Sequence, residues 1–492
     1  MKLLSKVLLI TVIGSWATVA MAADAAVAPK SEDPKPKAAA LEPNRTDQKT
    51  NPATTPKSTA PLTIDQALEI AFCNNPDLRI ATDAVNRAIG VKAEARARFN
   101  PAFTSQIVQL YQGPSVSIAG SAMTGGKATT ITPPSQTSAQ VSALLPLDIF
   151  GKLRYSSDIA SDQFQISYLS LLRTSEQLVA QVKSNYYELL RACGQAETAQ
   201  SAVDVATVRL KNTEARFAAG TVPRFDLTTA QVDLANLNQN LIAAQSRVNI
   251  AQANLNRVLG IAPESSTQVL KSPIAVDMST VDIPLMTKTA QDQRPEVKIQ
   301  KMNIALNKTN IALQRTEAKP SLGIGGNYNY VSAQSFSATN FSYQVAATLT
   351  IPIWDGGVTK ARVDQAYADL YSARDTLDQV QLSVGQEVSN AVLVLQEAAK
   401  RTKTTAENVD LAQEALRLAN VRYEAGIAVL VEVTNAESQL TQALFNQVNA
   451  QYDYAIALAQ LQRVTATQPE LSKLRLIDNK PVLGPSPKQA AS

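Results

Sequence analysis

Apolar and polar residues alternate in two stretches of the second half of the chain. Between residues 321 and 331, leucine, isoleucine and tyrosine alternate with glycine and asparagine. Between residues 341 and 353, one face is mostly Phe, Tyr, Val, Leu and Ile, while the other is mostly Ser, Gln and Thr. A period of two residues is the signature of a β-strand. The pattern predicts a β-hairpin over about 320–354.

A looser version of this pattern occupies about 101–148 in the first half. Phe103, Ile107 and Tyr111 mark an outgoing strand, and alternating apolar residues over 141–147 mark the return. The intervening residues 112–139 are rich in Gly, Ser, Ala and Thr, which predicts an exposed loop.

Strands of this length and polarity fit the wall of a membrane β-barrel. About ten residues tilted across the bilayer suffice, with an apolar face toward lipid and a polar face toward the lumen. A soluble sheet that covers a core is the commoner meaning of such alternation. We expect the barrel, because aromatic residues cluster toward the strand ends and the predicted helices are too long and too polar to cover the apolar face.

Helical periodicity covers most of the remaining chain. Residues 153–219 and 359–425 contain no proline and place apolar residues three and four positions apart, as coiled coils do. Each holds 67 residues, which gives a helix of about 100 Å. Gly220 and Gly426 follow these helices, and glycine is common just beyond a helix C-terminus.

Four shorter helical segments, 64–99, 226–259, 286–319 and 432–464, are each about half as long. Two of them placed end to end match one long helix. The lengths lead us to expect that 286–319 continues 226–259, and that 64–99 continues 432–464. Residues 261–285 would then form a connector at mid-height.

The chain is internally duplicated. Nine residues recur unchanged 206 positions later: Arg216, Ala219, Gly220, Thr228, Ala230, Leu234, Leu255, Arg257 and Val258. Pro76, Ala93 and Pro101 recur at an offset of 219 positions. The change of offset falls in the strand region and is consistent with a longer loop in the first copy. We expect a first repeat over 62–260 and a second over 286–465.

The two ends of the chain have other compositions. Residues 1–22 have the layout of a signal peptide, with Lys2 and Lys6 before a short apolar run and small residues at the cleavage point. Residues 23–61 are rich in Pro, Ala and Lys and are expected to be disordered. Residues 466–492 are expected to form a flexible tail.

The amino-acid composition argues against an enzymatic function. The chain has no histidine, which is the commonest general base and metal ligand. Cys73 and Cys193 do not form a metal-ligand cluster and are expected either to be free or to pair in a disulfide. We expect no catalytic residues, no metal and no cofactor. A net charge of +4 over 492 residues is too weak to indicate a nucleic-acid partner.

Four strands cannot close a barrel, and open sheet edges are not tolerated in lipid. Three chains would supply twelve strands above a long helical tube. The expected fold class is therefore an α+β membrane protein. Its trimeric 12-stranded outer-membrane β-barrel would be continuous with a periplasmic α-helical coiled-coil barrel.

Three motifs on this duplicated plan resemble the TolC-like outer-membrane efflux proteins. They are the turn at residues 146–152 (PLDIFGK) and the helix tips at 216–221 (RFAAGT) and 422–427 (RYEAGI). The resemblance covers about residues 62–465. It implies a homotrimeric duct of an efflux or type I secretion system in the outer membrane of a Gram-negative-type bacterium, with most of the chain in the periplasm.

The resemblance also implies partners and sites. The partners would be a periplasmic adaptor (membrane fusion) protein, an inner-membrane transporter of the RND, ABC or MFS type, and outer-membrane lipid. Adaptor docking would use the helix tips: Arg216, Gly220, Thr221, Arg422, Tyr423, Gly426 and Ile427. The junctions between barrel and helices would be Pro101, Pro146, Gly151, Pro320, Pro352 and Gly357.

Acidic residues beyond the second tip constrict the tunnel in this family. Glu432 occupies the first such position, and Asp226 is its first-repeat equivalent. The second position holds Asn435, which departs from the best-known family pattern. Arg224 and Arg422 are candidate partners of these acids, although acids in a first helical turn are also favoured by the helix dipole.

The main alternative is a periplasmic coiled-coil scaffold or adaptor that does not enter the membrane. It would explain the long helices but would leave the four strands without a purpose.

Overall fold

The structure is a computed structural model in which all described residues belong to one compact unit. It describes residues 61–118, 129–132, 134–271, 276, 282–332, 340–468, 476–477 and 480–481. The expected signal peptide, nearly all of the expected disordered segment and most of the expected tail lie outside these residues.

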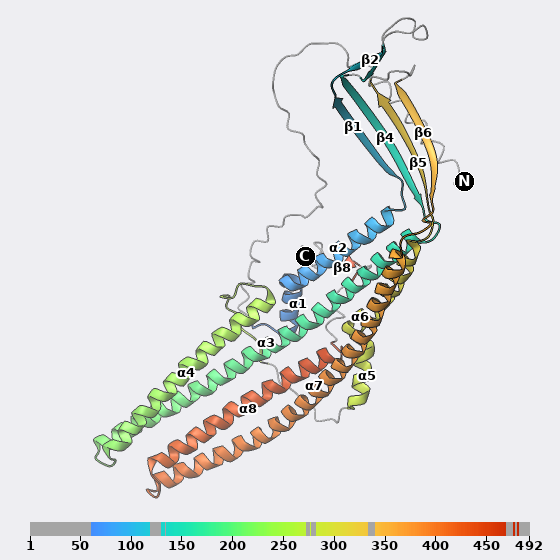
Figure 1. The fold of residues 1–492 in the computed structure, drawn as a ribbon. Helices are drawn as coiled ribbons and strands as arrows, with labels where there is room; N and C mark the ends of the chain where they lie inside the picture. Colours follow the sequence, from blue (N-terminus) through green and yellow to red (C-terminus); the bar gives the residue numbers. More distant parts are fainter. Residues whose placement is uncertain are drawn as a thin grey trace, which may run out of the picture. The chain divides into compact units, whose positions relative to one another are not determined.

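The two halves of the chain have the same order of long elements (Figure 1). The helices are α1 (Ile64–Asn74), α2 (Pro76–Ala97), α3 (Lys152–Ala218), α4 (Arg224–Leu259), α5 (Ile283–Gln293), α6 (Pro295–Thr316), α7 (Val358–Glu424) and α8 (Leu430–Val464). The strands are β1 (Ala102–Tyr111), β2 (Val116–Ile118), β3 (Thr129–Thr132), β4 (Ser135–Leu147), β5 (Ser321–Val331), β6 (Phe341–Thr350), β7 (Leu476–Ile477) and β8 (Lys480–Pro481).

Both long helices are confirmed at 67 residues, each beginning one residue earlier than expected. Within the described part of the chain, no helix combines the length and the apolar character needed to cross a membrane.

The expected continuous helices over 64–99 and 286–319 are wrong, because each is broken by a proline. A residue before proline is disfavoured in the helical region, so α1 ends before Pro76 and α5 ends before Pro295. Asn75 occupies the first break, where its side-chain oxygen caps α2 by accepting from the backbone N–H of Asp77 at 2.9 Å and of Leu78 at 3.2 Å. Arg294 occupies the equivalent place in the second half.

The expected pairing of half-helices is also wrong, because α4 meets α1 of its own half. The Asn75 amide donates to the carbonyl oxygen of Val258 at 2.9 Å, near the end of α4. The connector makes this possible by returning to the chain entry, where Leu62 forms a parallel bridge with Val269. The Tyr186 hydroxyl of α3 stabilises this bridge by donating to the carbonyl oxygens of Leu62 and Leu270.

The four long strands form one antiparallel sheet in the order β1-β4-β5-β6. Among the described residues, β1 pairs only with β4 and β6 only with β5, so both are edge strands. The sheet register separates two faces. The rows Ser105–Val141–Tyr328–Tyr343, Phe103–Ala143–Gly326–Val345 and Ile107–Ala139–Tyr330–Phe341 lie on the apolar face. The rows Thr104–Ser142–Asn327–Gln344 and Gln106–Gln140–Asn329–Ser342 lie on the polar face.

The expected loop over 112–139 contains more strand than its composition suggests. β2 pairs with β3, and β4 begins at Ser135 rather than near residue 141. The first residues of β4 alternate little in polarity, so their sequence carries no period-two signal. They are strand because they pair with β1, as the Tyr111–Ser135 and Gln109–Thr137 registers show.

The apolar core consists of two main clusters, one for each half. The first joins α1, α2, α3 and α4 and also includes Tyr452 of α8, and the second joins α5, α6, α7 and α8. Polar contacts from α3 to α8 link the halves: Lys183 donates to Gln462 at 2.7 Å, Gln195 to Asn449 at 2.6 Å and Arg191 to Asp453 at 2.8 Å. Two small clusters nearer the helix tips lie between α7 and α8 alone.

A charged cluster lies where α5 gives way to α6. The Arg294 side chain is only 4% exposed and donates to Glu387 of α7 at 2.8 Å and to Glu296 at 3.3 Å. Arg463 of α8 lies 3.9 Å from Glu387. Glu176 of α3 completes the cluster. Its burial, and next the negative charge of Glu296, raise the pKa of Glu176 to about 7, although Arg294, Lys298 and Arg463 oppose the rise.

Glu176→Gln is expected to stabilise the protein above pH 7 and to have little effect at acidic pH. Because the folded-state pKa of Glu176 is raised from 4.5 to about 7, the folded protein binds more protons in this window, and stability falls as the pH rises through it. The glutamine removes this cost, about 1–2 kcal/mol after allowance for partial exposure. Unfolding followed by circular dichroism across this pH range checks it. Exposed Glu264→Gln is the control, and an equal effect of Glu176→Gln at all pH values would contradict the prediction.

Candidate functional site: the helix tips and the strand–helix junctions

The two helix tips are built by the same backbone turn. At the end of α3, the Thr221 N–H donates to the Arg216 carbonyl and the Gly220 N–H to the Phe217 carbonyl, both at 2.9 Å. At the end of α7, the equivalent bonds run from Ile427 to Arg422 at 2.9 Å and from Gly426 to Tyr423 at 3.0 Å. The turn needs a left-handed residue, which Gly220 (φ +70°) and Gly426 (φ +75°) supply without the strain of a side chain.

Both tips expose apolar side chains to solvent. Ile427, Val429 and Phe225 are 74%, 69% and 69% exposed, although each is large enough to be favoured in a core. Phe225 and Val429 were missed by the sequence reasoning, which relied on the tip motifs and stopped at Thr221 and Ile427. The sequence signal that could have found them is a large apolar residue at the start of a helix that follows an exposed turn.

Glu432 forms an ion pair across the second tip. Its carboxylate lies 2.7 Å from the guanidinium of Arg422, so that the first turn of α8 is joined to the last turn of α7. Arg422, one of the two candidate partners, is therefore paired with Glu432. Both side chains are partly exposed, which limits the pair to about 1 kcal/mol or less.

The equivalent residues of the first tip are arranged differently. Asp226 is half-buried in the first turn of α4, but neither it nor Arg224 forms an ion pair with any residue that the structure describes. Asn435 is exposed on α8, one turn beyond Glu432. The structure thus pairs only one of the candidate gate residues with an arginine.

Two arginines of α3 reach from the first hairpin to the second. The guanidinium of Arg216 lies over the ring of Tyr423, 5.2 Å from its centroid. Arg209, two turns further from the tip, contacts Asp233 of α4 and Glu437 of α8, and its side chain is mostly buried. Arg209 was not singled out from the sequence. The residue 206 positions later is Ala415, so the charge of Arg209 is not shared by the two halves. This difference between the halves is the sequence signal that could have singled out Arg209.

The strand–helix junctions are closed by two aspartates in matching roles. The Asp148 carboxylate accepts from the backbone N–H groups of Leu153 and Arg154, at 3.2 and 2.9 Å, which caps α3. Asp355 accepts from the backbone N–H groups of Gly357 and Thr359, at 3.0 and 2.8 Å, which caps α7. A hydrogen bond from the Thr359 side chain, and next these backbone bonds, lower the pKa of Asp355. Neither aspartate is among the site residues predicted from the sequence.

The six predicted junction residues lie at or near the ends of strands and helices. Pro101 and Pro320 immediately precede β1 and β5. Gly151 (φ +82°) and Gly357 (φ +87°) are the residues before α3 and α7. Pro352 follows β6, whereas Pro146 lies inside β4, opposite Gly323.

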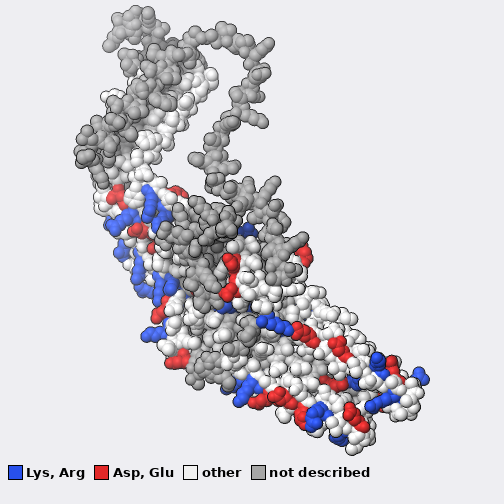
Figure 2. All heavy atoms as spheres, turned by 180° about the vertical axis from the view of Figure 1, so that it is seen from behind, with Lys and Arg blue, Asp and Glu red and all other residues white. Residues whose placement is uncertain are grey.

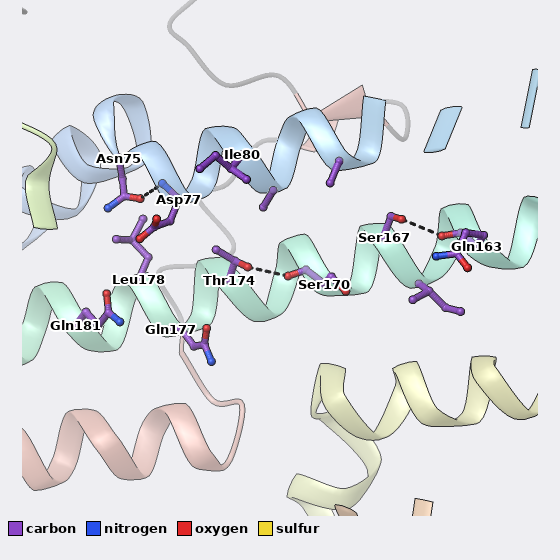
Figure 3. Close-up of a pocket in the computed structure, with 13 residues that line it drawn as sticks. Asn75, Asp77, Ile80, Gln163, Ser167, Ser170, Thr174, Gln177, Leu178 and Gln181 are labelled. Atoms are coloured by element: carbon purple, nitrogen blue, oxygen red, sulfur yellow. Dashed lines mark hydrogen bonds between the residues drawn. The ribbon is translucent and has the colours of Figure 1, made fainter. Parts of the chain in front are cut away.

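A groove of about 510 Å³ lies between α2 and α3 (Figure 3). Two of its hydroxyl groups bond within α3, where Thr174 donates to the Ser170 carbonyl and Ser167 to the Gln163 carbonyl, each at 3.0 Å. The described residues contain no cluster of acidic or cysteine side chains suited to a metal ion. Cys73 and Cys193 are free.

Comparisons with known proteins agree with this architecture. TolC of Vibrio cholerae, an outer membrane protein, is 23% identical over 303 residues, which cover 60% of this chain and 69% of that protein. The toxin and drug export protein A of Aggregatibacter actinomycetemcomitans is 22% identical over 397 residues, covering 79% and 84%. The crystal structure of the Campylobacter jejuni CmeC outer membrane channel superposes with a TM-score of 0.70 at 15% identity, covering 83% and 88%.

The model of the outer membrane efflux protein family matches residues 67–261 and 286–467, on both sides of the connector. The matched regions contain the strand–helix junctions and both helix tips. The shared fold agrees with the α+β class expected from the sequence, with four long strands in each chain. The family resemblance expected from the tip and turn motifs is confirmed: the chain belongs to the outer membrane efflux protein family.

Proposed function

We propose that three copies of this chain form an exit duct through the outer membrane and across the periplasm. The observation that carries the proposal is a two-faced sheet with two open edges, joined directly to two 67-residue helices. None of the residues in β1, β4, β5 and β6 is charged. Edge strands in lipid must be paired, and pairing β6 of one copy with β1 of the next would close a 12-stranded barrel.

The apolar face of the sheet fits the lipid side of such a barrel. Tyr111, Tyr328, Tyr330, Phe341 and Tyr343 gather at the end of the sheet away from the helices, where aromatic residues favour the membrane–water interface. The opposite face carries Gln, Asn, Ser and Thr and would line the lumen. The duct would hold no catalytic group, and the relatives in this family are channels and exporters rather than enzymes.

The helix tips would dock a periplasmic adaptor, which connects the duct to an inner-membrane transporter. Their exposed apolar side chains, such as Phe225 and Ile427, offer contact area, and Arg216 and Arg422 offer hydrogen-bond donors. The matched relatives include an export protein for toxins and drugs, and the cargo of this chain would be set by its transporter. A crosslinker placed at Ile427 would capture the adaptor if the tips dock it.

Glu432 would constrict the tip end of the duct. Three such carboxylates around one axis would favour cations, and the bond from Arg422 would hold each in place. Glu432→Ala is therefore expected to raise the conductance of the isolated trimer in planar bilayers and to reduce its cation preference. Arg422→Ala is expected to raise conductance without reducing cation preference.

Glu424→Ala is the matched control, because Glu424 is an exposed acid near the same tip that makes no ion pair with the described residues. Unchanged conductance and selectivity in Glu432→Ala would rule out the gate. Cell fractionation separately tests the duct against a scaffold outside the membrane. A detergent-extracted trimer from the outer membrane supports the duct, and a chain released without detergent supports the scaffold.

A further inference from the structure

Lys and Arg side chains surround the ends of the helices that adjoin the sheet. On the face drawn in Figure 2, they gather over the helices next to the uncharged strands. We define the junction collar as residues 92–101, 148–157, 312–320 and 354–363. It holds nine basic residues, Lys92, Arg96, Arg98, Lys152, Arg154, Arg315, Lys319, Lys360 and Arg362, against four acids. Its net charge of +5 exceeds the +4 of the whole chain.

The four acids of the collar are already engaged. Glu94 pairs with Arg98 and Glu317 with Lys152, each at 3.0 Å. Asp148 and Asp355 are committed to capping α3 and α7.

Four exposed cations, by contrast, form no ion pair with any described residue: Arg96, Arg154, Lys360 and Arg362. They come from α2, α3 and α7, so the positive charge belongs to the junction as a whole rather than to one helix.

Exposed apolar side chains lie in the turns of the junction collar. Ile353 and Trp354, in the turn between β6 and α7, are 96% and 88% exposed. Ile149 and Phe150 are exposed in the matching turn between β4 and α3, and Lys319 lies over the Phe150 ring at 5.6 Å. Tryptophan and cationic side chains found together at the end of apolar strands are characteristic of the boundary between hydrocarbon and headgroups.

We propose that the junction collar binds the headgroups of anionic phospholipids in the periplasmic leaflet. This inference rests on the proposed function, which places the apolar strands in the membrane. Trp354 and Ile353 would enter the edge of the hydrocarbon, and the four unpaired cations would lie in the plane of the lipid phosphates. Basic clusters next to a membrane segment attract anionic lipids in this way.

Trp354 gives a direct probe. The chain has two tryptophans, and the other, Trp16, lies in the expected signal peptide, so the mature chain would carry Trp354 alone. The trimer would be reconstituted in phosphatidylcholine vesicles in which brominated phosphatidylglycerol or brominated phosphatidylcholine is the minor lipid. Because bromine quenches tryptophan only at contact range, the ratio of the two quenching efficiencies measures lipid preference beside Trp354. We expect brominated phosphatidylglycerol to quench several-fold more.

The preference is expected to disappear in a variant with Arg96→Gln, Arg154→Gln, Lys360→Gln and Arg362→Gln. The matched control changes four exposed basic residues outside the collar, Lys211, Arg247, Arg257 and Lys400, to Gln and should retain it. Equal quenching by both lipids in the unmodified protein would overturn the collar and leave the membrane duct standing. Absence of quenching by either lipid would show that Trp354 is outside the membrane and would likewise overturn the collar, whereas the duct is tested separately by the cell fractionation described above.

Discussion

Gly260→Ala is expected to lower the free energy of unfolding by about 3 kcal/mol. Gly260 ends α4 in the left-handed region (φ +73°), where an alanine costs about 1 kcal/mol. A Cβ atom at this position would also lie 2.5 Å from the carbonyl oxygen of Asn74, at the end of α1. Because that neighbour is backbone, relief would require α1 and α4 to move apart, and such overpacking costs about 1–3 kcal/mol.

Gly220→Ala separates these two contributions. Gly220 has nearly the same φ, but a Cβ atom there would meet no heavy atom within 4 Å. It should therefore show only the conformational cost of about 1 kcal/mol. Denaturant unfolding followed by circular dichroism in one detergent would measure both variants. Equal losses in the two would mean that the contact between α1 and α4 does not constrain the fold.

Arg294→Gln is expected to destabilise the protein by about 3 kcal/mol at neutral pH. Arg294 is the buried cation that neutralises Glu296 and Glu387. Its loss leaves these carboxylates facing Glu176 without their main counter-charge, and breaking a buried pair at one partner typically costs about 3–5 kcal/mol. The partial exposure of Glu387 favours the lower end of this range.

A second substitution distinguishes charge from packing. If charge dominates, Glu296→Gln in the Arg294→Gln background should recover part of the loss. The double-mutant cycle would then give a coupling energy that Arg417→Gln with Glu414→Gln, an exposed pair on α7, does not show. Additive losses from Arg294 and Glu296 would instead assign Arg294 a packing role.

Sequence periodicity was sufficient for most of the fold. The two long helices depend on uninterrupted helical pattern and a terminal glycine, which are local signals, and their ends agree within a residue. The β5–β6 hairpin likewise depends on alternation within each strand. Local motifs also indicated the family, because the tip motifs at 216–221 and 422–427 recur at the same offset as the rest of the repeat.

One kind of error is local, because the helices expected over 64–99 and 286–319 are broken at Pro76 and Pro295. The other errors concern contacts between distant segments. Equal segment lengths could not show that α4 meets α1, because that contact is fixed by Asn75, Val258 and the bridge at Leu62. The start of β4 depends on its partner β1 rather than on its own composition. Arg209 and the Arg216–Tyr423 contact were missed for the same reason, since both join helices that are far apart in sequence.

Arg216 and Arg422 are equivalent in the repeat but held by different forces. Arg216 lies over a neutral ring, whereas Arg422 is paired with a carboxylate. Dissolved salt screens an exposed pair of opposite charges strongly, and it weakens a short-range contact with an aromatic face less. Rising ionic strength should therefore release the arginine of the second tip before that of the first, so the salt concentration of the surroundings would change which tip has a free guanidinium.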